Sequence, residues 1–166
     1  MAPNLKLHAV AFISPQNQPI LIRTFTRQDQ QAIKYHYIAH TSLDVMEERV
    51  AGAGKAGDCY LGLLFSLEDA AVYGYITPLK VKVVLVLPMS DSVVRDAEII
   101  TIFKALHMAY YSSISNPFLK LNCAADSNSE QSLLLAVGGP KWKNFKHRVD
   151  EICRIVGQNA NITASF

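Results

Sequence analysis

The sequence predicts an α+β domain: a five-stranded antiparallel sheet with one helix on one face and two on the other. Three observations lead to this prediction. Five short runs of β-favouring residues lie close together in the chain, a long helical pattern follows the second run, and two more follow the fifth. Short connections favour antiparallel pairing, and each helix needs a sheet face to cover its apolar stripe. The expected order is β-β-α-β-β-β-α-α.

The first two strands form the expected N-terminal hairpin. Leu5 to Ile13 is apolar on both of its alternating sides, which is typical of a strand inside a sheet that is covered on both faces. The turn "SPQNQP" leads into a second strand, "ILIRTF". The first helix is expected over Gln31 to Ala51, and the glycines of "GAGKAG" end it.

Three further strands are expected over Cys59 to Phe65, Val72 to Thr77 and Lys80 to Leu87. The second helix follows over Val94 to Ser113, with Asp91 or Ser92 as its N-cap. Its spacing predicts a buried stripe of Ile99, Phe103, Leu106 and Tyr110.

A third helix is expected at the C-terminal end. Pro140 suits its first turn, where a missing N–H does no harm, and Gly157 is the expected terminator. The apolar positions of this helix follow a regular 3-4-3-4 spacing: Trp142, Phe145, Val149, Ile152 and Val156.

Length and composition indicate a single domain over residues 1–166, with a mobile loop at 119–139. Of the 166 residues, 50% are hydrophobic and 18% are charged, and the net charge is +2. So small a charge gives no argument for nucleic acid as a partner. No run is long enough to insert into a membrane, and the three scattered cysteines predict neither a disulfide framework nor a zinc site. A reduced, cytoplasmic protein is expected.

Two motifs are better explained by structure than by ligand binding. "GAGKAG" fits G-x-G-x-x-G, but a helix precedes it and a strand follows, which reverses the order that a dinucleotide site needs. The segment "KWKNFKHRVDEICR" interleaves basic and aromatic residues. Its aromatic residues lie on the buried stripe and its basic residues fall elsewhere, which favours a solvated helix face over RNA binding, and an acidic partner or membrane surface remains an alternative. No cofactor is expected.

The first helix carries the candidate site. His36, His40 and Asp44 are spaced as a strip of two imidazoles and a carboxylate, which suggests a metal site or a catalytic relay. If Ala39, Leu43, Met46 and Val50 mark the core direction, His36 falls almost within it and His40 at its edge. Asp44 has then rotated about a right angle away, at about 100° per residue, so the three groups diverge. Neither a third ligand nor a nucleophile is visible, so no catalytic or metal residue is assigned.

The outward side of this helix is better suited to a protein contact. It mixes an aromatic residue, two aliphatic residues and carboxylates, whereas a solvated face should be mostly charged. Scattered surface apolar residues are the alternative. The predicted partner interface consists of Tyr37, Ile38, Thr41, Asp44, Val45 and Glu48.

These residues also carry a family resemblance. "YHYIAHTSLDVMEERV", "YLGLLFSLEDAAVYGYIT", "KVKVVLVL" and "RDAEIITIFKALHMAYY" with the following "NPF" together resemble the sedlin family. The resemblance implies a longin-like (SNARE-like) fold, and Asp44 matches the family's partner-binding aspartate.

The resemblance further implies a non-enzymatic subunit of a TRAPP complex, an assembly that tethers vesicles and activates Rab-type GTPases by nucleotide exchange. The implied partners are other TRAPP subunits, including the large TRAPP II-type subunits, and indirectly a Rab-type GTPase. The implied location is cytoplasmic, peripheral to Golgi and ER–Golgi membranes. Two alternatives stay open: another longin-type trafficking module, such as an adaptor small subunit, and a metal-dependent enzyme that uses His36 and His40.

Overall fold

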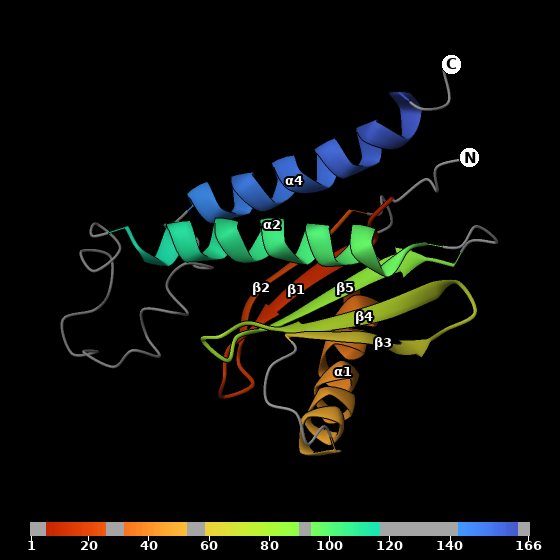
Figure 1. Cartoon of the computed structure of the whole chain (residues 1–166), viewed down its shortest axis with the longest axis vertical. Helices are drawn as coiled ribbons and strands as arrows, with labels where there is room; N and C mark the ends of the chain where they lie inside the picture. Colours follow the sequence, from red (N-terminus) through yellow and green to blue (C-terminus); the bar gives the residue numbers. More distant parts are fainter. Residues whose placement is uncertain (1–5, 26–31, 53–58, 90–93, 117–142, 163–166) are drawn as a thin grey trace.

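The computed structural model describes residues 6–25, 32–52, 59–89, 94–116 and 143–162. The predicted order of elements is confirmed within these ranges (Figure 1). The five strands are β1 (Ala9–Ile13), β2 (Pro19–Thr24), β3 (Tyr60–Ser66), β4 (Ala70–Ile76) and β5 (Lys82–Pro88). The helices are α1 (Ala32–Gly52), α2 (Asp96–Ile114) and α4 (Lys143–Ile162).

The strands form one antiparallel sheet in the order β2-β1-β5-β4-β3. The N-terminal hairpin therefore pairs with the last strand, because β1 lies directly against β5, with Ala11 opposite Val84. This pairing places the two strands that are apolar on both sides at the centre of the sheet. The hairpin strand β2 and the bulged strand β3 form its two edges.

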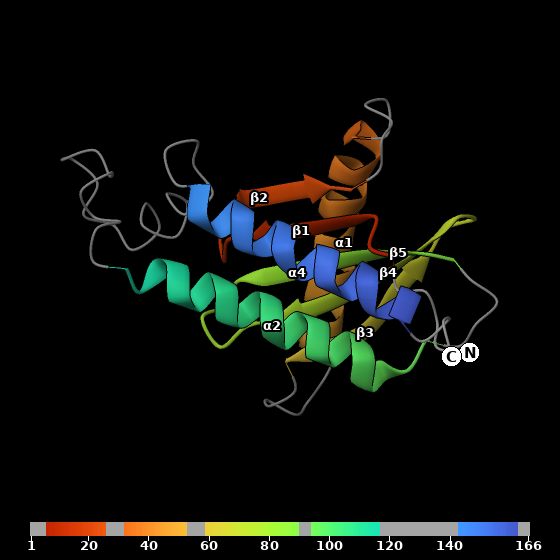
Figure 2. The same cartoon turned by 90° about the horizontal axis from the view of Figure 1, so that it is seen from above.

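The helices cover both faces of the sheet as predicted. Helix α1 lies beneath the sheet, and α2 and α4 lie above it (Figure 1). Viewed from above, α2 and α4 run beside one another, while α1 crosses behind the strands (Figure 2). Each face has its own apolar core, because alternate residues of β1 point to opposite sides: Val10 and Phe12 pack under α2 and α4, and Ala11 and Ile13 pack against α1.

The inner stripe of α2 is as predicted: Ile99, Phe103, Leu106 and Tyr110 are fully buried. The predicted N-cap is wrong, since the cap residue is Arg95, which makes no side-chain capping bond. The two acidic residues of the first turn, Asp96 and Glu98, favour this start because carboxylates stabilise the positive end of the helix dipole.

Helix α4 buries Phe145 and Val149 as predicted, but it continues past Gly157. Glycine costs about 1 kcal/mol inside a helix and does not by itself end one. Residues 119–139, Pro140 and Trp142 lie outside the described ranges. No helix within those ranges is both long and apolar enough to cross a membrane.

Candidate functional site

The outward face of α1 is a convex surface with one apolar half and one acidic half. Ile33 and Tyr37 are exposed at 79% and 72%, and Asp44 and Glu48 follow on the same side of the helix. The hydroxyl of Thr41 donates to the Tyr37 carbonyl oxygen at 2.9 Å, so it is already bonded within the helix. We call this set the α1 face: Ile33, Tyr37, His40, Thr41, Asp44 and Glu48.

The opposite side of α1 holds the helix on the sheet. Its buried residues pack against β1, β3, β4 and β5 in one apolar cluster: Tyr35, Ile38, Ala39, Leu43 and Met46. Ser42 is buried among them, and its hydroxyl donates to the Ile38 carbonyl oxygen at 2.6 Å. The α1 face is therefore presented by a rigid element.

The structure corrects the predicted orientation of α1. Ile38 is only 2% exposed, so its place in the predicted interface is wrong, and Val45 is half-buried beside the same cluster. His36 and His40 are exposed, whereas the sequence placed them at the core edge. The error came from taking Ala39, Leu43, Met46 and Val50 as the core side: Val50 is 50% exposed, and the buried residues Tyr35, Ile38 and Ser42 were left out. With Tyr35, Ile38 and Ser42 included, the core direction turns away from His36 and His40.

Tyr37, Thr41, Asp44 and Glu48 remain together on the outward side, with Asp44 and Glu48 exposed. Sequence reasoning missed Ile33 and His40. The signal was present, because Ile33 lies one turn before Tyr37 and His40 lies one turn before Asp44.

The acidic half of α1 contains three carboxylates, of which Glu47 is paired with groups of the sheet layer and Asp44 and Glu48 face solvent. Glu47 accepts a hydrogen bond from Asn17 at 3.0 Å and lies 3.5 Å from the ammonium of buried Lys82, which also donates to Asn17. The Asn17 hydrogen bond and then the Lys82 charge lower the pKa of Glu47. Asp44 and Glu48 show no hydrogen bond or ion pair with any other described residue, so their charges face solvent.

The other end of α1 is tied to the β3–β4 turn. The Lys34 ammonium donates to both carboxylate oxygens of Asp69, at 2.9 and 2.7 Å, and this hydrogen bond lowers the pKa of Asp69. His8 lies beside this pair with its ring edge toward Tyr35, and burial lowers its pKa. These groups fasten the helix at the end that carries Ile33 and Tyr37.

The histidine strip does not assemble a metal site within the described ranges. No three histidine, cysteine, aspartate or glutamate side chains there come close enough to hold an ion. Of the two cysteines described, Cys59 is half-buried and Cys153 is buried, and both are free. The α1 face thus offers the chemistry of a protein contact: protruding apolar side chains next to carboxylates.

The Sedlin family model matches residues 12–134 of the chain. The chain belongs to the sedlin family. Its sheet and helices fit the longin-like fold that the resemblance implied.

The chain is similar to named proteins from animals and from an amoeba. The trafficking protein particle complex subunit 2-like protein of Bos taurus is 43% identical over 113 residues, which cover 66% of this chain and 80% of the relative. The protein of the same name from Xenopus tropicalis is 44% identical over a stretch of the same length and coverage. That of Dictyostelium discoideum is 38% identical over 126 residues, covering 74% of this chain and 89% of the relative.

Proposed function

We propose that this chain is a non-enzymatic scaffold subunit of a TRAPP vesicle-tethering complex, and that the α1 face contacts a neighbouring subunit. The observation that carries the proposal is the pairing of Ile33 and Tyr37, two protruding apolar side chains, with the solvent-facing carboxylates of Asp44 and Glu48. Interfaces combine such an apolar centre with a polar rim. The names of the relatives support the choice of complex.

Within that complex the chain would act through other subunits, including the large TRAPP II-type subunits, and indirectly on a Rab-type GTPase. It would lie on the cytoplasmic side of ER–Golgi and Golgi membranes as a peripheral component. An adaptor small subunit is the second candidate, because the longin-like fold is compatible with it. The two candidates differ in the proteins that co-purify with the chain.

The test is affinity purification of the tagged chain from its native cell, followed by mass spectrometry of its partners. We expect TRAPP subunits with the wild type and a clear loss of at least one of them with Asp44→Tyr. Asp44 is exposed, so the free energy of unfolding should change by no more than about 0.5 kcal/mol. Glu151→Tyr is the control, because it replaces an exposed carboxylate on α4, on the other side of the sheet. This variant should retain the partners that Asp44→Tyr loses.

The outcomes separate the site from the function. Equal recovery of every subunit by the wild type and Asp44→Tyr would show that the α1 face is not the contact. Adaptor subunits in place of TRAPP subunits among the wild-type partners would contradict the proposed complex itself.

A further inference from the structure

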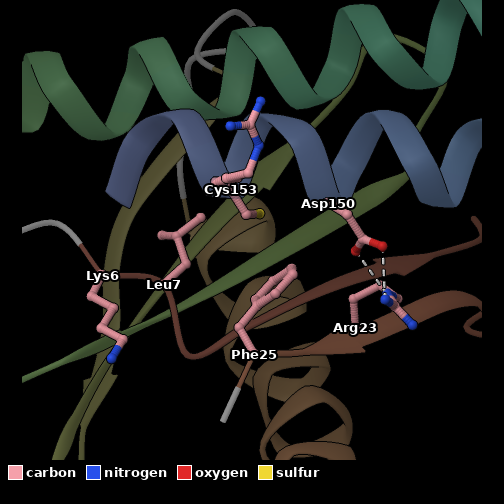
Figure 3. A pocket seen from close by; sticks show the side chains of 7 residues that line it. Lys6, Leu7, Arg23, Phe25, Asp150 and Cys153 are labelled. Carbon is pink, nitrogen blue, oxygen red and sulfur yellow. Dashed lines mark hydrogen bonds and ion pairs between the residues drawn. The ribbon is translucent and has the colours of Figure 1, made fainter. Parts of the chain in front are cut away.

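A second candidate binding site lies in the opposite layer of the molecule, between α4 and the sheet edge. It is a pocket of about 290 Å³ between the segment before β1, the end of β2 and the middle of α4 (Figure 3). Its apolar lining comes from Leu7, Phe25 and Cys153. Burial raises the pKa of the Cys153 thiol to about 12, so this thiol is neutral and belongs to the apolar lining.

An ion pair between β2 and α4 forms one wall of the pocket. The Arg23 guanidinium donates to both carboxylate oxygens of Asp150, at 2.9 and 2.8 Å (Figure 3). Such a two-bond pair fixes both side chains in one geometry. Asp150 is the one carboxylate among the described lining residues and is committed to this pair, and the lining also contains the basic residues Lys6 and Arg154.

More cations extend this charge along α4. Lys143, Lys146 and His147 lie on the same side of the helix as Asp150 and Arg154, by the three- and four-residue spacing of helix neighbours. Lys143, His147 and Arg154 are exposed and Lys146 is half-buried. Arg148 is also exposed, but it lies at the opposite edge of the solvent-facing surface of α4. We call the pocket with Lys143, Lys146 and Arg154 the α4 site.

We propose that the α4 site binds an acidic segment of a partner protein, with one apolar side chain of that segment seated in the pocket. The volume of the pocket suits a single large side chain, since pockets for drug-sized ligands begin at about 300 Å³. The line from Lys143 to Arg154 spans eleven helix positions, about 16 Å, which is the length of about five extended residues. Carboxylates on those residues would meet the cations beside the pocket.

The shape of the site favours a protein segment over a lipid surface. A helix that lies on a membrane presents a protruding apolar face to the acyl chains. Helix α4 instead buries Phe145 and Val149 and leaves Ile155 as its one large exposed hydrophobic residue over the side chains described, residues 143–156. A pocket with charged residues at its rim can accept a side chain of a partner, but it presents no apolar side chain that would insert into a membrane. This inference goes beyond the proposed function, because it concerns a different face and a different partner chemistry.

The test measures binding of a fluorescein-labelled peptide in which one phenylalanine is flanked on both sides by glutamates. Fluorescence anisotropy should show saturable binding to the whole chain that weakens as salt is added. Lys143→Glu should weaken the affinity about fivefold, because it replaces an attraction by a repulsion at an exposed position. The matched control is Arg148→Glu, an equal charge reversal on the other side of the same helix, which should leave the affinity within about twofold.

The pocket is tested separately from the charge. Cys153→Met should fill part of the pocket and reduce binding, with circular dichroism confirming that the variant is folded. Should it fail to fold, a peptide with serine in place of phenylalanine tests the same point on the wild type and should bind about tenfold more weakly.

Three results would overturn the proposal. Lys143→Glu and Arg148→Glu could bind the peptide equally. The serine peptide could bind as well as the phenylalanine peptide. The chain could bind vesicles of phosphatidylserine and phosphatidylcholine while ignoring the peptide, which would identify a membrane surface.

Discussion

The α1 face and the α4 site offer opposite chemistry from opposite sides of one sheet. On α1 the apolar side chains of Ile33 and Tyr37 protrude and the nearby free charges are carboxylates. On α4 the apolar side chains line a pocket, and the net charge around the pocket is positive. In the two proposals, the α1 face would insert side chains into a partner and the α4 site would receive one.

The difference arises from how each helix meets the sheet. Among the described elements, α1 is the one helix on its face of the sheet (Figure 1), and Tyr37, Asp44 and Glu48 on its outward side are exposed. Helix α4 lies beside α2 over the other face and toward the β2 edge, where the chain before β1 and the end of β2 build the walls of a pocket (Figure 2). A lone helix gives a convex surface, whereas a helix at a sheet edge can form a concave one. Because the two surfaces lie on opposite sides of the sheet, the two proposed partners would not compete for the same surface.

The largest effect is expected from loosening α4. Phe145 is fully buried with its ring centroid 4.9 Å from that of Phe12 and 5.5 Å from that of Tyr110. Phe145→Ala should lower the free energy of unfolding by about 3–5 kcal/mol, because it removes a large side chain and leaves a cavity among aromatic rings. Urea unfolding followed by far-UV circular dichroism measures the change.

Met46→Ala provides the comparison on the α1 side of the sheet. Met46 is fully buried in the other core, and its truncation should cost about 2–5 kcal/mol without touching the packing of α4. A loss below about 1 kcal/mol for Phe145→Ala would mean that α4 is not fastened by its inner stripe, and the pocket would lose its rigid wall.

A smaller effect, in binding and not in folding, is expected at Tyr37. This side chain is 72% exposed, so Tyr37→Ala should leave the free energy of unfolding within about 0.5 kcal/mol of the wild type. Tyrosine is enriched among interface hot spots, so the loss of Tyr37 should weaken capture of the neighbouring subunit by about 1–2 kcal/mol, measured by competition with the wild-type chain. Ile155→Ala, at an exposed position on α4, should leave that capture unchanged. Equal losses for both variants would erase the proposed difference between the two faces.

Much of this architecture was predictable because the two-sided strands and the inner stripe of α2 are strong local signals. Ile99 and Leu106 repeat at helical spacing and both are fully buried, so pattern and burial agree. On α1 the same reasoning failed because Val50 is exposed, whereas Tyr35, Ile38 and Ser42, which the predicted core side left out, are buried. Which positions of a helix are buried depends on the surface that covers the helix, and the helical pattern alone does not contain that surface.

The pocket could not be predicted from the sequence. Its walls come from Leu7, Phe25 and Cys153, which are far apart in the chain and carry no shared motif. The Arg23–Asp150 pair joins residues 127 positions apart. Only the packing of α4 against the β2 edge brings these groups together, whereas each residue of the α1 face was visible within a single helix.

The smallest effect concerns the pH dependence of stability. His8, beside α1, has its pKa lowered from 6.5 mainly by burial, with the charges of Lys34 and Lys6 acting in the same direction and Asp69 opposing them. As pH falls through 6.5, His8 becomes protonated in the unfolded chain while it stays neutral in the folded chain. The free energy of unfolding therefore falls until the pH passes the lower pKa of folded His8.

His8→Phe keeps a ring against Tyr35 and removes this proton, so unfolding measured between neutral and mildly acidic pH should show a shallower loss of stability. The slope should shrink and not vanish, because burial also lowers the pKa of His107 on α2. An unchanged slope would mean that His8 is not shielded at the end of α1 that presents Ile33 and Tyr37.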